Sequence, residues 1–102
     1  MEFTKVFELS PIDGRKSFYG KANAVLTYTG RGYAVWECWS YNTRVCSYNS
    51  DTGEFTREWW GYSVTTMRHV NAFMARMGFS YGGKSWWDSL PVGTPVNLWK
   101  VG

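Results

Sequence analysis

One stretch constrains the fold more than any other, because residues 62–79 (YSVTTMRHVNAFMARMGF) carry the clearest helical period in the chain. Apolar side chains recur there at spacings of three and four, which places them on one face of an α-helix. They are Met67, Val70, Phe73, Met74 and Met77. Arg68, Ala72 and Arg76 fall on another face, which we expect to meet water. Hydroxyl side chains can cap the first turn and a glycine follows the last, so the helix is predicted over about residues 64–77.

The residues before this helix predict antiparallel strands joined by turns. Residues 1–9 form a first strand, and residues 22–29 alternate apolar and polar side chains as a half-buried second strand does. Residues 30–32 (GRG) then provide a short hairpin turn, because glycine adopts positive φ at little cost. A turn centred on Arg31 leads into the next strand and predicts two cross-strand pairs. They are Leu26 with Trp36 and Ala24 with Cys38.

Beyond Ser40 the alternation changes phase, which has two interpretations. A bulge or bend near Ser40–Asn42 would continue one long strand, whereas a separate tight turn would create a second hairpin. We favour the long bent strand, in which the eight residues from Cys38 to Cys46 span about 26 Å. The two thiols would then be too far apart for a disulfide, whereas in the tight hairpin they would lie opposite each other.

The rest of the chain adds a strand at residues 54–60 and an apolar C-terminal segment without a clean period. Residues 80–84 are expected to be flexible, and residues 94–101 are a candidate edge strand. The sequence therefore predicts one compact α+β domain over residues 1–102. Its expected architecture is a small antiparallel sheet of three to five strands with one α-helix packed across one face.

The aromatic content is 20%, with seven tryptophans, and so many rings cannot all be buried in a chain of 102 residues. Exposed rings mark a surface that contacts a partner. We expect the exposed anchors among Trp59, Trp60, Trp86 and Trp87.

The formal net charge is only +3, but the charges are unevenly distributed. Residues 15–36 and residues 59–87 contain basic side chains and no acid. If these two segments share a face, that face attracts phosphate or an acidic protein; otherwise its cations are ordinary solvated side chains. The candidate binding cations are Lys16, Lys21, Arg31, Arg68 and Arg76.

The start of the predicted helix is the most distinctive local cluster of polar groups. A helix N-terminus presents free amides and a partial positive charge, which favour an anion. The side chains able to complete such a site are Ser63, Thr65, Thr66, Arg68 and His69. The favoured alternative is plain capping, in which one hydroxyl accepts from the first turn and His69 binds a nearby carbonyl.

Patterns of known catalytic sites are absent from the sequence. A single histidine excludes a histidine-rich metal site, and the two cysteines lack metal-ligand spacing. No phosphate-binding glycine loop, nucleophile elbow or dinucleotide fingerprint occurs. A pair of His69 with Cys38 or Cys46 is less favoured than two thiols that act as small core side chains. We therefore expect no metal, no cofactor and no enzyme activity.

The sequence also predicts where the protein resides. Residues 1–9 lack the apolar run of a signal peptide, and no apolar run approaches the roughly 20 residues that span a bilayer. We therefore expect a cytoplasmic protein without membrane contact, in which both cysteines are reduced.

Three motifs in this order resemble a family of small phage and mobile-element proteins of unknown function. They are KSFYGKA at residues 16–22, SYNTRV at residues 40–45 and SVTTMRHVNAF at residues 63–73. In that family an SFYGKA segment, an SYNTxV strand and an SxTTxRHIxxF helix start recur, usually with fewer tryptophans than here. Because the family has no known function, the resemblance implies no particular activity for this chain. It implies a compact accessory domain that acts in the cytoplasm of an infected or element-bearing bacterium.

Small size, surplus aromatic rings and segregated charge are typical of a protein that forms interfaces. We expect a non-catalytic phage or mobile-element binding protein, whose partner is a host or phage protein complex. Inhibition of a host defence system, with a CRISPR effector as the target, is one form of this hypothesis. The alternative is a nucleic-acid or nucleotide-binding protein that stacks bases on exposed rings and holds phosphates with lysine and arginine.

Overall fold

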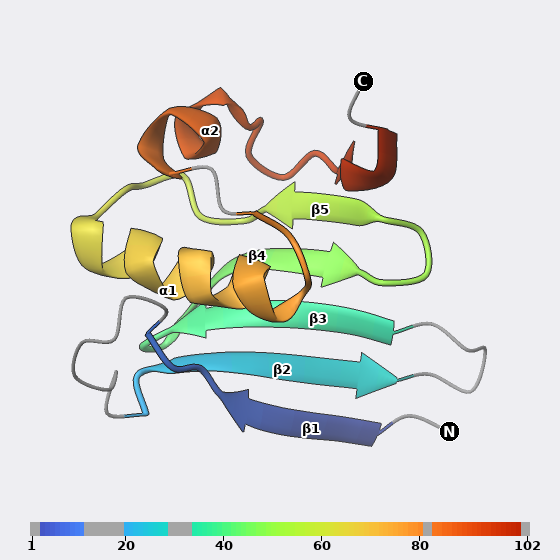
Figure 1. Cartoon of the computed structure of the whole chain (residues 1–102). Coiled ribbons are helices and arrows are strands. Elements are labelled where there is room, and N and C mark those ends of the chain that lie inside the picture. Colours follow the sequence, from blue (N-terminus) through green and yellow to red (C-terminus); the bar gives the residue numbers. More distant parts are fainter. Residues whose placement is uncertain (1–2, 12–19, 29–33, 81–82, 101–102) are drawn as a thin grey trace.

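A computed structural model describes residues 3–11, 20–28, 34–80 and 83–100 (Figure 1). The strands are β1 (Phe3–Glu8), β2 (Ala22–Tyr28), β3 (Ala34–Ser40), β4 (Thr43–Asn49), β5 (Glu54–Arg57) and β6 (Val96–Asn97). The helices are α1 (Val64–Arg76) and α2 (Gly83–Ser89), and a 3-10 turn, Leu98–Lys100, follows β6. The six strands form one antiparallel sheet in the order of the chain. The α+β class is confirmed, but the sheet has more strands than the three to five expected.

The predicted helix and the first predicted register are confirmed. α1 covers Val64–Arg76, and Ser63 caps it with extended backbone angles and a side chain that accepts from the Thr66 amide. In the sheet Leu26 pairs with Trp36 and Ala24 pairs with Cys38, as alternation predicts.

The long bent strand expected beyond Ser40 is wrong. β3 ends at Ser40 and β4 begins at Thr43, so a two-residue turn makes the tight hairpin. The prediction failed because Tyr41 takes the left-handed φ of 57° that such turns usually give to glycine or asparagine. Cys38 and Cys46 are consequently direct cross-strand partners, and both are buried free thiols. A register shift lies between Cys38 and Trp39, before the Ser40–Asn42 segment where a bulge or bend was expected.

The helix rests on a part of the sheet built from small side chains. Ala22, Ala24, Cys38 and Cys46 are all 0% exposed, and their small volume lets α1 approach the strands closely. From the helix, Val70 and Phe73 are also fully buried, together with Met67 and Met74. Ala72 is buried as well, contrary to the expectation that this face meets water. It lies three residues after His69 and four before Arg76, on a helix face whose side chains contact Ser40 and Trp36 of β3.

The segment after α1 was expected to be flexible and without helix, but α2 begins within it at Gly83. Its seven residues are too few to display a period, so sequence alone gave no helical signal. The Trp86 ring lies 5.5 Å from that of Phe55 in β5, and the α2 residue Trp87 is only 1% exposed. α2 thus completes the core beside α1, above β5 in Figure 1.

Candidate functional site

The segment between β5 and α1 carries the most exposed large side chain in the described part of the chain. This segment, residues 58–63, is called here the tryptophan loop. Trp60 in it is 79% exposed and Tyr62 is 38% exposed, while Val64 in the first turn of α1 is 69% exposed. Trp59 is half-buried, with its ring 6.4 Å from that of Trp60. The loop therefore presents an aromatic and aliphatic edge to its surroundings.

The buried side chain of Arg57 fixes the shape of the tryptophan loop. Its Nε donates to the Trp59 carbonyl at 2.9 Å, and its Nη2 donates to the carbonyls of Trp60 at 2.7 Å and Gly61 at 3.1 Å. Arg57 is only 6% exposed, so its donors face carbonyl oxygens in place of water. Hydrogen bonds from a charged donor are stronger than neutral ones, which makes the loop a preorganised part of the fold.

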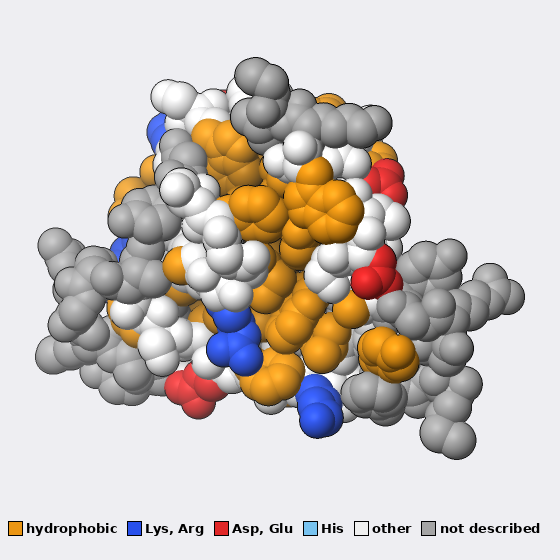
Figure 2. Space-filling model, turned by 45° about the vertical axis from the view of Figure 1, so that its right-hand side comes forward, with side chains coloured by type: hydrophobic (Ala, Val, Ile, Leu, Met, Phe, Trp, Pro, Cys, Tyr) orange, Lys and Arg blue, Asp and Glu red, His pale blue; other side chains and the backbone are white. Residues whose placement is uncertain are grey.

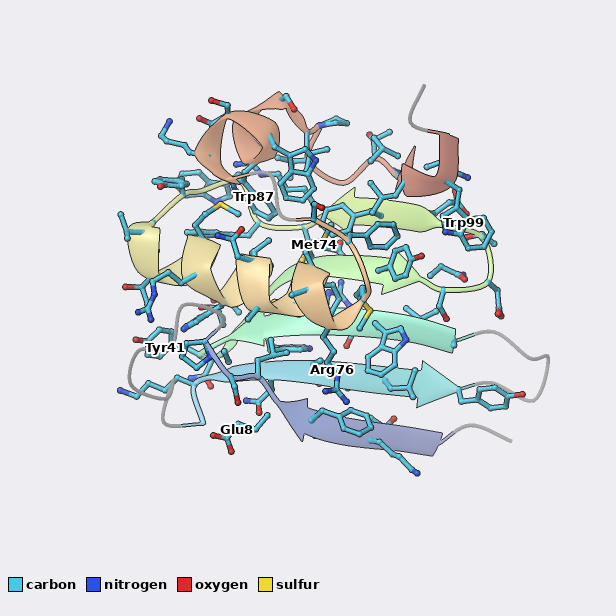
Figure 3. All side chains as sticks on the ribbon, viewed as in Figure 1. Glu8, Tyr41, Met74, Arg76, Trp87 and Trp99 are labelled. Atoms are coloured by element: carbon cyan, nitrogen blue, oxygen red, sulfur yellow. The ribbon has the colours of Figure 1, made fainter. Side chains whose placement is uncertain are left out.

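Trp87 supports the same loop from α2, and Figure 3 shows its side chain between the two helices. Its indole Nε1 donates to the Gly61 carbonyl at 2.9 Å. A Cβ on Gly61 would lie 2.5 Å from the Trp59 ring, so only glycine allows this close contact. The loop backbone is therefore held by hydrogen bonds from Arg57 of β5 and Trp87 of α2, and by the Trp59 ring packed on Gly61.

A shallow depression lies beside the loop, and its side chains leave no room in it for even a water molecule. Its lining residues are Trp59, Tyr62, Ser63, Thr66, Met67, Val70 and Trp87. Pockets for small molecules usually measure about 300–1,000 Å³. This depression is therefore a closely packed junction between the loop and the two helices and not a binding pocket.

The polar residues at the start of α1 mostly bond within the protein. The Ser63 hydroxyl accepts from the Thr66 amide at 3.0 Å, and the Thr66 hydroxyl lies 3.4 Å from that of Ser40. Ser40 also shares a 2.7 Å hydrogen bond with His69 Nδ1. Of the five residues considered for an anion site, Thr65 is exposed and Arg68 is half-buried. This arrangement agrees with the capping interpretation.

His69 and the cysteines form no catalytic pair in the structure. Cys38 Sγ lies 4.0 Å from the backbone carbonyl of His69, while the imidazole bonds to Ser40. Burial lowers the pKa of His69, and the positive charge of nearby Arg68 lowers it further. Burial raises the pKa of the Cys46 thiol well above its usual value, with Cys38 beside it as a second cause. Both effects favour neutral, structural side chains.

The predicted basic face is not brought together as one cluster. Lys21 lies 5.4 Å over the ring of Tyr41, which Figure 3 shows at the left side of the sheet. Arg76 lies elsewhere, 4.5 Å over the Phe7 ring and 5.8 Å over Trp36. The predicted cations Lys16 and Arg31 lie outside the described residues.

The four predicted aromatic anchors have different environments. Trp60 is highly exposed, Trp59 and Trp86 are half-buried, and Trp87 is buried. The expectation that Trp87 is an exposed anchor is wrong, because α2 directs its indole inward to the Gly61 carbonyl.

Sequence patterns missed Arg57, which organises the loop. Charged residues are rarely buried without an acidic partner, and here backbone carbonyls take that place. One signal was present, since Arg57 follows Phe55 by two residues and therefore points to the same, inward face of β5.

Among the described residues, no group of three or more histidine, cysteine, aspartate or glutamate side chains is placed to hold a metal ion. Within the same part of the chain, no helix has the length and apolar character needed to cross a membrane.

Comparison with known proteins gave one match. The model of a family of unknown function (DUF8033) matches residues 7–89, which include all of α1, α2 and the tryptophan loop. No curated protein and no solved structure matches the chain.

Proposed function

This chain belongs to a family of unknown function (DUF8033), and we propose that it is a non-catalytic binding protein that docks on another protein through its tryptophan loop. The observation that carries this proposal is Trp60, whose side chain is 79% exposed. The loop that bears it is nevertheless held by three backbone hydrogen bonds from Arg57. An indole on a rigid loop can enter a partner's pocket without the entropy cost of ordering that loop.

The neighbours of Trp60 extend the same contact surface. Tyr62 and Val64 are exposed beside it, at 38% and 69%. Tryptophan and tyrosine are enriched where interfaces gain most of their binding energy. Lys84 lies 5.1 Å over the Tyr62 ring and pairs with Asp88 at 2.6 Å, so the margin of this surface carries an ion pair.

The proposed setting is the cytoplasm of a bacterium that carries a phage or mobile element. The resemblance of three sequence motifs to phage and mobile-element proteins supports this setting, and one of these motifs covers the start of α1 next to the tryptophan loop. In this proposal the partner is a protein complex of the host, and blocking a defence complex such as a CRISPR effector is the expected outcome.

Nucleic-acid binding is the second candidate function, and one observation favours it. Lys21 lies over the 54% exposed ring of Tyr41, which is an arrangement that can stack a base and hold its phosphate. The two functions differ in salt dependence, because phosphate contacts weaken steeply as salt rises and aromatic protein contacts do not.

The test begins with purification of the tagged protein and its partner from the bacterial host, with identification of the partner by mass spectrometry. Binding of the purified partner is then measured by calorimetry for wild type and Trp60→Ala at two salt concentrations. We expect Trp60→Ala to weaken binding by about 2 kcal/mol or more, with little effect of salt.

Val6→Ala is the matched control, because Val6 is 64% exposed in β1, away from the loop. It should bind like wild type. Equal affinity of Trp60→Ala and wild type would refute the docking surface, and binding of nucleic acid with steep salt dependence would support the second function instead.

A further inference from the structure

Large side chains are only partly buried where α1 ends. In Figure 1, α1 lies over the left part of β3 and β4 and leaves their right part open. The strand register places bulky residues in that open part, with Trp36 paired to Leu26 on one side and to Tyr48 on the other. The small residues beneath α1 lie in the next inward-facing row, where Ala24 pairs with Cys38.

These rings form one continuous surface, called here the aromatic face. It consists of Phe7, Trp36, Phe79 and Trp99 around the buried ring of Tyr48. The ring centres of Phe7 and Trp36 are 5.6 Å apart, and those of Tyr48 and Phe79 are 5.2 Å apart. The Trp99 Nε1 donates to the Tyr48 hydroxyl at 3.1 Å. Figure 2 shows the resulting band of hydrophobic side chains on the surface.

The rings of the aromatic face are held in place although they meet solvent. Trp99 is 56% exposed, yet its ring packs so tightly on Gly53 that a Cβ there would lie 2.4 Å from it. Arg76 stacks over both Phe7 and Trp36. Neighbouring aromatic rings that are held in place and partly exposed are typical of an interface.

The charges around the aromatic face have opposite signs at its two ends. Exposed Arg76 and Lys5 lie beside Phe7 and Trp36 at one end. Exposed Asp51 lies at the other end, in the β4–β5 turn whose Gly53 supports Trp99. Figure 2 shows basic side chains at the lower end of the band, with acidic colour at the lower left beside them, and acidic side chains along its right margin.

We propose that a second copy of this chain covers the aromatic face, in a dimer with two-fold symmetry. In a two-fold dimer the same surface is used twice, so each end of the face meets the opposite end of its partner. Arg76 of one copy then lies opposite Asp51 of the other, and the rings pack together between these two contacts. A partner of one uniform charge would be repelled at one end, whereas a second copy is complementary at both.

The experiment is a charge exchange followed by sedimentation equilibrium over a range of concentrations. We expect wild type to dimerise. Arg76→Glu and Asp51→Arg should each raise the dimer dissociation constant about tenfold or more. The two-fold axis places each new like-charge contact at both ends of the interface, so every substitution introduces two repulsions. The double variant Arg76→Glu/Asp51→Arg restores opposite charges and should dimerise nearly as well as wild type.

Glu8→Arg is the control, because this exposed charge in β1 alternates to the other side of the strand from Phe7. It should leave the dimer unchanged, and so should Trp60→Ala, which separates this test from that of the tryptophan loop. Melting curves verify that each variant is folded, and Asp51→Arg remains informative if Arg76→Glu loses stability. A monomeric wild type, single variants that dimerise normally, or a double variant without rescue would each overturn the proposal.

Discussion

The guanidinium of Arg57 and the indole of Trp87 form one buried unit that links β5 to α2. Arg57 Cζ lies 4.6 Å from the centre of the Trp87 ring, and its Nη1 donates to the Trp87 carbonyl at 2.6 Å. Both side chains also bind the Gly61 carbonyl. A change in either residue should therefore disturb the tryptophan loop as well as the core.

Replacing Arg57 tests this link. Arg57→Met removes the donors to four carbonyl oxygens and should lower the free energy of unfolding by about 3 kcal/mol or more. Urea denaturation measures the loss. Arg44→Met is the control, because the Arg44 side chain is 46% exposed and its ion pairs with Glu37 and Glu58 should contribute only about 1 kcal/mol or less. Equal losses for both variants would contradict the special role of Arg57.

A charge placed under α1 should unfold the domain. Val70 is 0% exposed, and Val70→Asp would bury an unpaired carboxylate at a cost of several kcal/mol. Circular dichroism and thermal melting provide the readout. Val64→Asp in the same helix should be tolerated, because Val64 is 69% exposed and an acid in the first turn interacts well with the helix dipole. A cooperatively melting Val70→Asp protein would refute this packing of α1.

Stability should fall in mildly acidic solution because of His69. Its pKa is lower in the folded protein than its ordinary value of 6.5, so the unfolded chain binds the proton more readily. The contribution of His69 is therefore complete above that ordinary value and is lost as pH falls below it, by at most about 1.4 kcal/mol per pH unit.

Urea denaturation between about pH 7.5 and pH 5.5 measures this dependence, since the carboxylates titrate mainly at lower pH. His69→Gln removes the only histidine of the chain and should flatten the profile. If wild type and His69→Gln lose stability in parallel over this range, another group is responsible.

The two thiols should be protected in the native protein but free on unfolding. Cys38 and Cys46 are both 0% exposed, so an alkylating reagent has access to neither thiol. Burial also raises the pKa of Cys46, which disfavours its reactive thiolate. Intact-mass measurement without reductant should show no adduct on the native protein and two adducts in denaturant. No adduct in denaturant would reveal a disulfide, for which the cross-strand position of the two cysteines is suitable.

The sequence predicted the parts of the fold that depend on regular periodicity. α1 followed from its apolar stripe, and the Leu26–Trp36 pairing followed from alternation on both sides of one turn. The hairpin at Tyr41 was missed because its turn contains no glycine, and α2 was missed because it is short. These elements are fixed by tertiary contacts, such as those of Trp87, that no local pattern contains.

The candidate sites were predictable only in part. Surplus aromatic residues correctly indicated exposed rings, and Trp60 is one of them. Which rings are exposed depends on how α2 directs Trp87 inward and how Gly53 supports Trp99, and both contacts join distant parts of the chain. The grouping of Arg68 with Arg76 assumed that charges on one helix share a partner. In the structure Arg76 instead stacks on Phe7 from the first strand.

The order of strands in the sheet has a consequence for synthesis of the protein. Each strand from β2 to β5 pairs with the strand made just before it, so pairing needs no contact between strands that are distant in the chain. Because α1 and Trp99 follow these five strands in the chain, the sheet can form on the ribosome while its large side chains are still uncovered. During that interval the nascent chain exposes Trp36 and Tyr48 to other proteins, and completion of the C-terminal third ends the exposure of Tyr48.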